Sequence, residues 1–285
     1  MSKRIHANDG ISSTGRKTFE AAGFTVTTDS IPQEKLAAYI NEQQVEVLLV
    51  RSATKVRKEL MDACPGLRMV GRGGVGMDNI DKAHAAANGV TLFNTPASSS
   101  ISVAELVMAH LYNLMRGLHE ANRQMPARGA SDFKQLKKAY GGGQELRGKT
   151  LGIIGFGRIG QWTARYAIGA GMNVIVTDNR SGTYQLAVPL GGGHSIAAVS
   201  IEHVPLDKLL KASDAISLHV PTQPDGRAVI GAEQLAMMKD GAVLVNAARG
   251  GSVDEDALLA ALKSGKLRGA ALDVFVNEPT PRADI

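Results

Sequence analysis

Three glycines at fixed spacing carry the clearest chemical signal in this sequence. Gly155, Gly157 and Gly160 follow an apolar run and precede a segment with helical character. The first glycine permits a tight turn between strand and helix, the second lets the backbone approach a phosphate, and the third lets the helix pack closely on the sheet. The N–H groups of Arg158 and Ile159, where the helix starts, would face negative charge. The spacing therefore predicts a loop that binds a dinucleotide pyrophosphate.

An acid at the end of the next predicted strand indicates which dinucleotide is bound. The strand Asn173–Asp178 ends in a carboxylate about 20 residues beyond the last glycine, where it can accept hydrogen bonds from ribose hydroxyls. The same carboxylate would repel the 2′-phosphate of NADP, although Arg180 could attract one. A glycine-rich turn in any α/β protein is the simpler alternative, but the strand, the helix and the acid all agree. We therefore expect NAD as the cofactor.

Strand and helix signals alternate along the first third of the chain. Apolar spacing predicts helices at Gln33–Gln44 and at Lys55–Ala63, where Val56 and Leu60 lie four residues apart. Such alternation predicts a parallel sheet with helices on its faces. Short strands are expected at Arg4–Ala7, Thr25–Thr28, Val45–Val50, Arg68–Val70 and Thr91–Phe93.

A long apolar helix, Val103–Met115, separates this region from the glycine loop, and His110 and His119 are expected to pack on it. Because it is apolar over much of its circumference, it must be buried between domains or against another subunit. A second doubly wound unit starts near Lys149, so we expect two α/β domains with parallel sheets, residues 1–97 and 98–285. Glycine runs at 141–143 and 191–193 are expected to be surface turns. Further strands are expected at Ala215–Val220, Ala242–Asn246 and Ala270–Phe275.

Composition restricts the possible classes of protein. The 285 residues are 44% apolar and 21% charged, as in an ordinary soluble globular protein with room for two cores. No run approaches a signal peptide or the ~20 apolar residues of a membrane helix, and the single cysteine, Cys64, fits a reducing cytoplasm. Cys64 lies at a predicted helix end and is expected to be a small buried residue. The net charge of +5 is dispersed, aromatics are few and no zinc pattern occurs, so we expect neither nucleic acid, membrane nor metal as partners.

Several further segments have the order and spacing of one protein family. Besides the glycine loop they are Arg51–Val56, Val70–Asp81, Asn94–Pro96, Ala104–Leu106, Leu218–Pro221, Val245–Gly251, Ala271–Phe275 and Glu278–Pro279. Together these segments resemble the D-2-hydroxyacid dehydrogenase family over almost the whole chain. The resemblance implies a Rossmann-type nucleotide domain inserted in a flavodoxin-like substrate domain, assembled as homodimers or homotetramers.

Three charged residues match the reacting groups of that family. A hydride must leave the carbon of a 2-hydroxy acid while a base takes the hydroxyl proton and the carboxylate is held. Arg249 is the candidate clamp, because its planar fork binds a carboxylate and its place after a strand suits the ligand-binding edge of a parallel sheet. Glu278 matches the acid that orients the catalytic histidine, and Asp273 matches the aspartate that accepts from the nicotinamide carboxamide; a surface arginine and solvated acids are the alternatives. Further cofactor contacts implied by the resemblance are His219, Val220, Pro221, Ala247 and Ala248.

A loop with four glycines in six positions, Gly71–Gly76, offers backbone N–H groups that can converge on an anion. In the family this loop binds the substrate carboxylate, whereas the alternative is a turn that only reverses the chain. The residues that the resemblance assigns to the substrate here are Arg72, Gly73, Gly74 and Val75.

Two arginines indicate the kind of 2-hydroxy acid. Arg51 and Arg72 add positive charge for a phosphorylated substrate, and so favour 3-phosphoglycerate, which relatives oxidise to 3-phosphohydroxypyruvate at the entry to serine synthesis. Lys137 and Lys138 resemble the basic segment that some relatives offer across the dimer, although exposed lysines are usually only solvated surface.

One residue that the resemblance implies does not occur among the 285. In the family a histidine in a Pro-His-x-Gly segment follows the glutamate and proline, together with the last strand of the nucleotide domain and a helix that returns to the substrate domain. As the chain stands, we expect NAD binding with turnover reduced about 10²- to 10⁴-fold, and we assign the dehydrogenase activity to the intact protein. The alternatives are a hydroxypyruvate or glyoxylate reductase and a non-catalytic protein that senses NAD.

Overall fold

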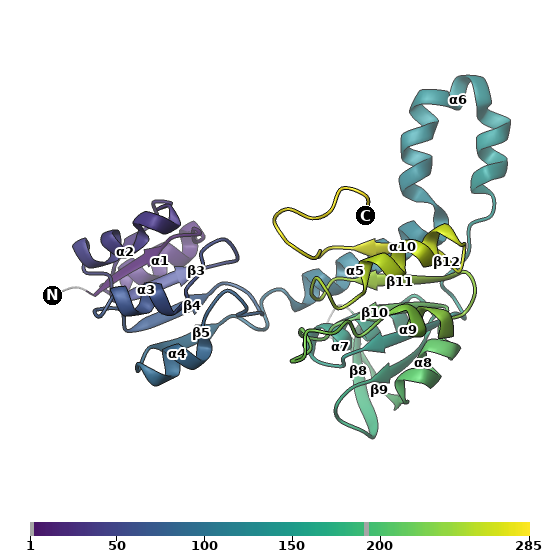
Figure 1. Ribbon diagram of the computed structural model, residues 1–285. Coiled ribbons are helices and arrows are strands. Elements are labelled where there is room, and N and C mark those ends of the chain that lie inside the picture. Colours follow the sequence, from purple (N-terminus) through teal and green to yellow (C-terminus); the bar gives the residue numbers. More distant parts are fainter. Residues whose placement is uncertain (1–2, 191–193) are drawn as a thin grey trace. The chain divides into compact units, whose positions relative to one another are not determined.

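The computed structural model describes residues 3–190 and 194–285, and the chain divides into two compact units, Met1–Ser99 and Ser100–Ile285 (Figure 1). Each unit contains one sheet of mostly parallel strands, with helices in the connections. Each also has its own clusters of buried apolar side chains. The predicted α/β fold class is confirmed.

The first unit contains a five-stranded sheet in the order β2-β1-β3-β4-β5, and every strand pair in it is parallel. This is the strand order of a flavodoxin-like fold. Its strands are β1 (Arg4–Ala7), β2 (Thr25–Thr27), β3 (Val47–Val50), β4 (Met69–Arg72) and β5 (Thr91–Asn94). Its helices are α1 (Ser13–Ala21), α2 (Gln33–Glu42), α3 (Lys58–Ala63) and α4 (Lys82–Ala87).

Local sequence explains where these helices begin and end. The side chains of Ser12 and Asp81 accept backbone N–H groups in the first turns of α1 and α4, which supplies the missing helical hydrogen bonds. The expectation that Val56 belongs to α3 was wrong. Val56 is extended, because its N–H and its carbonyl bond to the backbone at Asn79 and Asp81.

Cys64 follows α3 and is buried, as expected, and burial raises the pKa of its thiol.

The second unit contains a seven-stranded sheet in the order β12-β11-β10-β6-β7-β9-β8. Without the edge strand β8, which is antiparallel, this is the order of a Rossmann fold with six parallel strands. Its strands are β6 (Thr150–Ile154), β7 (Asn173–Thr177), β8 (Thr183–Leu190), β9 (His194–His203), β10 (Ala215–Leu218), β11 (Ala242–Asn246) and β12 (Leu267–Leu272). Its helices are α5 (Ser100–Arg116), α6 (Leu118–Tyr140), α7 (Arg158–Gly169), α8 (Leu206–Ala212), α9 (Ala232–Met237) and α10 (Glu255–Lys263).

The hairpin of β8 and β9 is the element that the sequence analysis did not predict. In β8 the side chains of Tyr184, Leu186 and Val188 are buried or half-buried while their neighbours are exposed, which is the alternation of a strand with one covered face. β9 pairs with β7 in parallel and completes the nucleotide-binding topology. The glycine run 191–193 lies outside the described residues, whereas the run 141–143 forms an exposed turn after α6.

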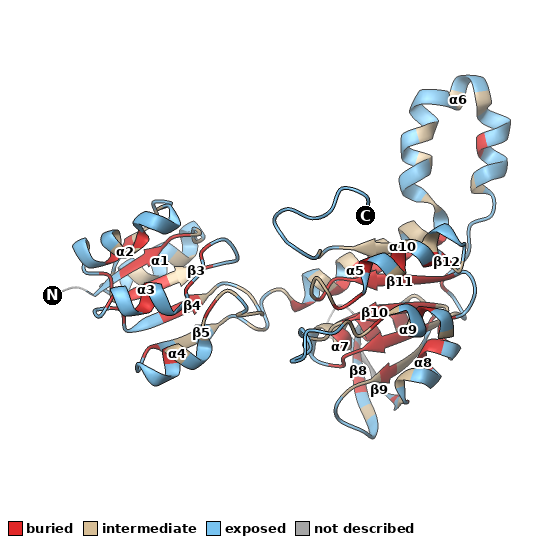
Figure 2. Ribbon diagram, viewed as in Figure 1, coloured by how far each residue is buried: buried red, intermediate tan, exposed pale blue. Residues whose placement is uncertain are grey.

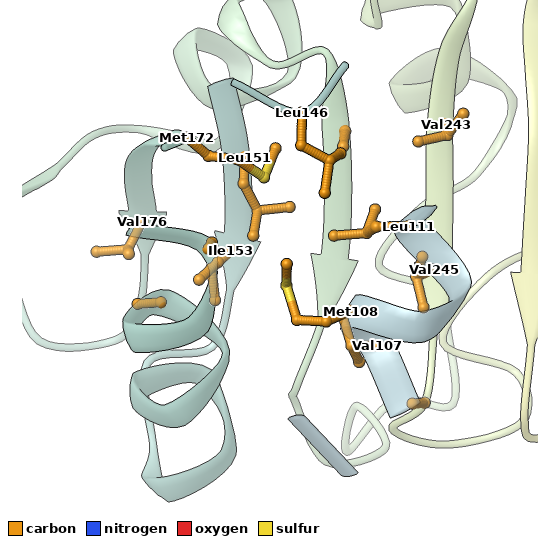
Figure 3. Packing of buried hydrophobic residues seen from close by; sticks show 14 of the residues in the cluster. Val107, Met108, Leu111, Leu146, Leu151, Ile153, Met172, Val176, Val243 and Val245 are labelled. Atoms are coloured by element: carbon orange, nitrogen blue, oxygen red, sulfur yellow. The ribbon is translucent and has the colours of Figure 1, made fainter. Parts of the chain in front are cut away.

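Buried side chains cover both faces of the second sheet. Leu151 and Ile153 of β6 face the cluster that includes α5 and α7 (Figure 3). Ile154 faces the cluster of α8, α9 and α10. The apolar helix α5 is therefore buried in its own unit, where Val107 and Leu111 are fully enclosed by β6, β11 and α7. The expectation that α5 is buried between domains or subunits was wrong for this face of the helix.

Helix α6 has few contacts with the rest of its unit. Within Leu118–Tyr140, all of which the structure describes, only Leu136 is buried, and Figure 2 shows the two legs of this bent helix exposed on nearly every side. The bend includes Asp132, whose backbone is not helical. His119 lies in α6, after the left-handed turn at Gly117, and not on the long helix as expected. Among the described residues, no helix is long and apolar enough to cross a membrane.

Candidate functional site

A pocket of about 790 Å³ lies at the carboxyl edge of the second sheet, beside strands β6, β7 and β10. The chain leaves β6 and β10 in opposite directions there, which is where ligands bind in open α/β sheets. The residues that line it include Gly155–Arg158 after β6, Asp178–Arg180 after β7 and His219–Pro221 after β10. The structure therefore brings most of the predicted cofactor residues together around one pocket.

The three glycines of the loop have different surroundings. Gly155 has a φ of +93°, and a Cβ on it would lie 2.6 Å from the carbonyl oxygen of His219. A Cβ on Gly160 would overlap the carbonyl oxygen of Gly155. Gly157 faces open space, with nothing within 4 Å of a Cβ position. Two glycines are thus required by packing, and the third leaves an open approach to the backbone, which fits a bound pyrophosphate.

The N-terminus of α7 provides a favourable electrostatic environment for that anion. Gly157 is its N-cap residue, without a side chain to satisfy the first N–H groups, and the first turn contains no acidic residue. Unsatisfied N–H groups and the helix dipole make such an end favourable for negative charge. Arg158, in the same turn, lines the pocket.

Asp178 holds the glycine loop in addition to facing the pocket. Its carboxylate accepts the N–H of Phe156 at 2.8 Å and that of Asn179 at 2.6 Å. Phe156 packs edge to face on Tyr184, whose hydroxyl donates to the carbonyl of Arg180. Burial raises the pKa of the Tyr184 phenol, and the nearby charge of Asp178 adds to the effect. Each carboxylate oxygen of Asp178 keeps a lone pair for a ribose hydroxyl.

His219 lines this pocket with a half-buried imidazole. Its Nε2 lies 3.0 Å from the hydroxyl of Ser217 and 3.3 Å from that of Thr163. Thr163 gives its hydrogen to the carbonyl of Ile159, so a hydrogen bond between Thr163 and His219 has Nε2 as its donor. Nδ1 is buried without a hydrogen-bond partner in the described part of the chain. Burial lowers the pKa of His219 to about 3.

The loop after β11 fixes the backbone at Arg249. The buried Asn246 donates to the carbonyl of Arg249 at 3.0 Å and accepts the N–H of Ala248 at 3.1 Å. The guanidinium of Arg249 donates to the carbonyl of Ala248 at 2.6 Å, and the residue is half-buried. Ala247 and Ala248 are buried beside it. Asn246 thus positions the predicted clamp, a role the sequence analysis missed, although the residue lies within the motif.

The segment after β12, which carries Asp273 and Glu278, packs on that loop. The carboxylate of Glu278 accepts the N–H of Phe275 at 2.7 Å, and the buried Glu255 accepts the next N–H at 2.8 Å. A Cβ on Gly250 would overlap the carbonyl oxygen of Phe275, so only glycine permits this approach. Asp273 is exposed after β12. The structure therefore brings the strand ends bearing Arg249, Asp273 and Glu278 into one part of the second unit.

The first unit has a separate pocket of about 510 Å³ at the carboxyl ends of β1, β3 and β4. Arg51, Arg72 and Gly73 line it, together with Asp9 and the start of α1. Phe19, Leu49 and Phe93 supply apolar walls. The pocket thus gathers three predicted substrate residues, whereas Lys137 and Lys138 lie exposed on α6 in the second unit.

The glycine-rich loop after β4 uses two of its N–H groups internally. Gly73 donates to the carbonyl of Val50 at 2.8 Å, and Gly74 donates to that of Arg72 at 3.0 Å. These two amides are therefore bonded to carbonyls of β3 and β4 and are not free for an anion in this structure. The guanidinium of Arg72 donates to the carbonyls of Arg51 and Gly76 and so holds the loop. Val75 is exposed at its tip.

Comparison with known proteins agrees with this geometry. The sequence model of the NAD-binding domain of D-isomer specific 2-hydroxyacid dehydrogenases matches residues 108–284, more than half of the chain. The chain belongs to the D-isomer specific 2-hydroxyacid dehydrogenase family. Its second unit is an NAD-binding domain, which confirms the predicted cofactor.

Relatives in the 2-hydroxyacid dehydrogenase family carry different names. A D-3-phosphoglycerate dehydrogenase from Methanocaldococcus jannaschii is 40% identical over 97% of this chain and 49% of its own length. A hydroxypyruvate reductase from Thermotoga maritima is also 40% identical, over 97% of this chain and 84% of its own length. The crystal structure of a D-lactate dehydrogenase from Aquifex aeolicus with NAD and lactic acid has a TM-score of 0.75, 28% identity, and coverage of 99% of this chain and 83% of that one. The chain spans about half the length of the curated D-3-phosphoglycerate dehydrogenases it matches.

The described residues contain no group of three His, Cys, Asp or Glu side chains placed to hold a metal ion.

Several residues of the site were missed by the sequence analysis. Asn179, Tyr184 and Gln161 line the cofactor pocket, and Glu255 holds the segment after β12. Tyr184 comes from the unpredicted hairpin, and Glu255 carries no signal because its partner lies 21 residues away.

Two similar glycine substitutions in the loop are expected to affect different properties, one the stability of the fold and the other the binding of NAD. Gly160→Ala is expected to lower the free energy of unfolding by about 1–3 kcal/mol, because the new methyl group overlaps a carbonyl oxygen. Gly157→Ala is expected to change stability by less than about 0.5 kcal/mol yet weaken NAD binding about tenfold or more, because its methyl group fills the approach to the backbone. Urea denaturation and titration calorimetry with NAD measure the two effects. Gly169→Ala, at the far end of α7 in open space, is the matched control. Normal NAD affinity in Gly157→Ala would contradict this account of the loop.

The imidazole of His219, whose Nδ1 is buried, predicts a pH dependence of stability. His219 binds a proton near pH 6.5 in the unfolded chain but only near pH 3 in the folded one, so its neutral burial destabilises the fold progressively as the pH falls from 6.5 toward 3. At pH 4.5 this loss amounts to about 2–3 kcal/mol. His219→Gln is expected to lose correspondingly less stability between pH 6.5 and 4.5 in urea denaturation, whereas His119→Gln, on the exposed α6, is expected to behave as the unaltered chain. Equal pH slopes for all three proteins would exclude a buried neutral His219.

Proposed function

We propose that this chain binds NAD and an anionic 2-hydroxy acid as the core of an NAD-dependent dehydrogenase, and that the acid is 3-phosphoglycerate, oxidised to 3-phosphohydroxypyruvate. The observation that carries the substrate assignment is the pocket of the first unit, where the exposed Arg51 lies on a loop held from several sides. A guanidinium at that place complements a phosphate, which lactate, glycerate and glyoxylate lack.

The residues divide the chemistry among them. NAD, when bound, supplies the acceptor for the hydride that leaves the hydroxyl-bearing carbon. Arg249 holds the substrate carboxylate and polarises the neighbouring oxygen. Glu278 stabilises the charged form of the acid–base histidine that takes the hydroxyl proton in the family, as a carboxylate beside an imidazole raises its pKa. Asp273, exposed after β12, would accept a hydrogen bond from the nicotinamide carboxamide.

Reduction of hydroxypyruvate is the second candidate function. The relative of that name from Thermotoga maritima is as similar to this chain as the phosphoglycerate dehydrogenase from Methanocaldococcus jannaschii, and it is matched over more of its own length. Both substrates share the carboxylate and the adjacent oxygen, so Arg249 serves either. Apart from the oxidation state of C2, the phosphate is the difference between them, and it makes Arg51 the residue that discriminates.

We also propose that a second copy of this chain covers α6, so that the protein is a homodimer or a tetramer of such dimers. An exposed helix with few contacts to its own unit gains little stability from that unit. Leu118, Met125 and Phe133 are large apolar residues exposed along α6. A patch that covers the same patch on another copy closes with two-fold symmetry, the commonest arrangement of soluble oligomers.

Arg51→Ala is expected to distinguish the two substrate assignments. Loss of a charge-assisted hydrogen bond to phosphate raises the Kd for 3-phosphoglycerate about 10- to 100-fold, while the Kd for D-glycerate changes less than about twofold. Titration calorimetry of both acids in the presence of NADH measures the ratio. Arg16→Ala, which removes an exposed arginine paired with Glu20 on α1, is the matched control. Equal changes for the phosphorylated and the plain acid would contradict the assignment of 3-phosphoglycerate.

Phe133→Glu is expected to convert the dimer to monomers at micromolar concentration, because it places a charge in the apolar surface that the second copy covers. Sedimentation velocity measures the mass of both proteins. Gln135→Glu adds the same charge two residues away and is expected to remain dimeric. A monomeric unaltered chain would rule out this interface.

A further inference from the structure

A continuous series of hydrogen bonds runs beneath the loop that carries Arg51. It connects His6, Asn8, Thr54 and Asp9, which come from the end of β1 and from the loop after β3. His6, Asn8 and Thr54 are buried, with exposed fractions of 0%, 6% and 4%. Buried polar groups are retained only where they are paired, since an unpaired one costs about 1–3 kcal/mol. None of the four is needed to contact cofactor or substrate in the proposed function.

The direction of each bond follows from the chemistry of its acceptor. The amide oxygen of Asn8 can only accept, so His6 donates to it from Nε2 at 3.1 Å and takes the hydroxyl hydrogen of Thr27 on Nδ1 at 2.9 Å. The same amide oxygen accepts the N–H of Ile31, which fixes the orientation of Asn8. Burial lowers the pKa of His6, consistent with a neutral ring.

The series continues from Asn8 to a carboxylate. The amide nitrogen of Asn8 donates to the hydroxyl of Thr54 at 2.8 Å, so that hydroxyl gives its own hydrogen to Asp9 at 2.5 Å. The hydrogens donated along the series, from Thr27 through His6, Asn8 and Thr54, therefore run toward Asp9, while the second amide hydrogen of Asn8 goes to the carbonyl of Ile31. The carboxylate ends the series, and its direction is fixed by Ile31 at Asn8 and by the carboxylate at Thr54.

The second carboxylate oxygen of Asp9 accepts hydrogen bonds from the backbone of the loop. That oxygen accepts the N–H of Arg51 at 2.6 Å and the N–H of Thr54 at 3.1 Å. Asn79 holds the same loop from the carbonyl side, because its amide nitrogen donates to the carbonyls of Arg51 and Thr54. The loop is thus fixed through both its donors and its acceptors, while the side chain of Arg51 remains exposed.

We propose that Asp9 is a positioning residue for anion binding, which acts by holding the backbone of Arg51 so that its guanidinium meets the substrate phosphate. This rests on the proposed function, in which Arg51 binds that phosphate. A carboxylate at the wall of an anion pocket would by itself oppose the anion. Its three donors, the Arg51 N–H, the Thr54 N–H and the Thr54 hydroxyl, offset much of that charge, and the gain is a preorganised arginine.

Asp9→Asn tests the proposal with nearly unchanged shape. The amide keeps one acceptor oxygen but places an NH₂ group against donors of the loop, so the Kd for 3-phosphoglycerate, measured by calorimetry with NADH present, is expected to rise about tenfold. The Kd for NADH is expected to stay within about twofold, because the cofactor pocket is lined by residues of the second unit. Asp62→Asn, whose carboxylate pairs with His84 on the surface, is the matched control and is expected to change neither constant.

A double-mutant cycle separates positioning from a general structural effect. If Asp9 acts through Arg51, Asp9→Asn adds less than about twofold to the Kd when Arg51 is already alanine, although each single substitution weakens binding. A loss of similar size in both backgrounds would overturn the positioning role.

A second variant keeps the proposal testable if Asp9→Asn fails to fold. Thr54→Val removes the hydroxyl that links Asn8 to Asp9 and keeps the carboxylate, and we expect the Kd for 3-phosphoglycerate to rise about threefold with an unchanged Kd for NADH. Unchanged 3-phosphoglycerate binding in both Asp9→Asn and Thr54→Val, together with weakened binding in Arg51→Ala, would overturn the inference and leave the proposed function intact. Unchanged binding in Arg51→Ala would instead overturn the proposed substrate.

Discussion

The close approach of two loops at the carboxyl edge of the second sheet is the constraint on which the cofactor site depends. Parallel strands deliver all their carboxyl ends to one edge, and β6 and β10 leave it in opposite directions. Gly155 lies against the carbonyl of His219 with a positive φ, so no side chain fits between the loops. That contact lets β6 turn directly into α7, whose N-terminus then faces the pocket. Removing the contact would move the anion-binding amides and the wall of the pocket together.

The first unit also gathers its pocket residues at the carboxyl edge of a parallel sheet, but it uses different chemical groups there. Asp9, Arg51 and Arg72 follow or end the parallel strands β1, β3 and β4, so their positions at one edge also follow from topology. Backbone amides contribute less to this pocket, because the N–H groups of Gly73 and Gly74 are bonded to carbonyls of the same unit. Positive charge comes from Arg72, whose guanidinium is held by hydrogen bonds, and from Arg51, whose backbone is held while its side chain is exposed. In the proposed function, the two pockets would therefore bind anions by unlike means, a helix end in one and arginines in the other.

The sequence could predict what depends on local spacing or on strand ends. The glycine loop, Asp178 and the α/β class follow from patterns within about 20 residues, whereas the role of Arg249 was assigned from the family resemblance and from its place after a strand. The bonds from Asp9 to Arg51 and from Glu255 to the segment after β12 join residues 42 and 21 positions apart, and no local pattern indicates them. The hairpin of β8 and β9 did have a signal, the alternation of buried and exposed residues around Leu186, which the sequence analysis did not use.

Residues that hold a loop and residues that contact a ligand have opposite charge requirements in this protein. Asp9 lines the pocket proposed to bind an anion, yet its carboxylate accepts backbone N–H groups from the loop it holds, and Glu255 likewise accepts one N–H from the segment after β12. Ordering one loop residue costs about 1–2 kcal/mol, and leaving a buried N–H unpaired costs about 1–3 kcal/mol, so two or three such bonds suffice to fix a short loop. Because those bonds also absorb the acid's charge, the preference of a pocket for anions cannot be derived by counting the charges around it. It depends on which carboxylates already have their donors.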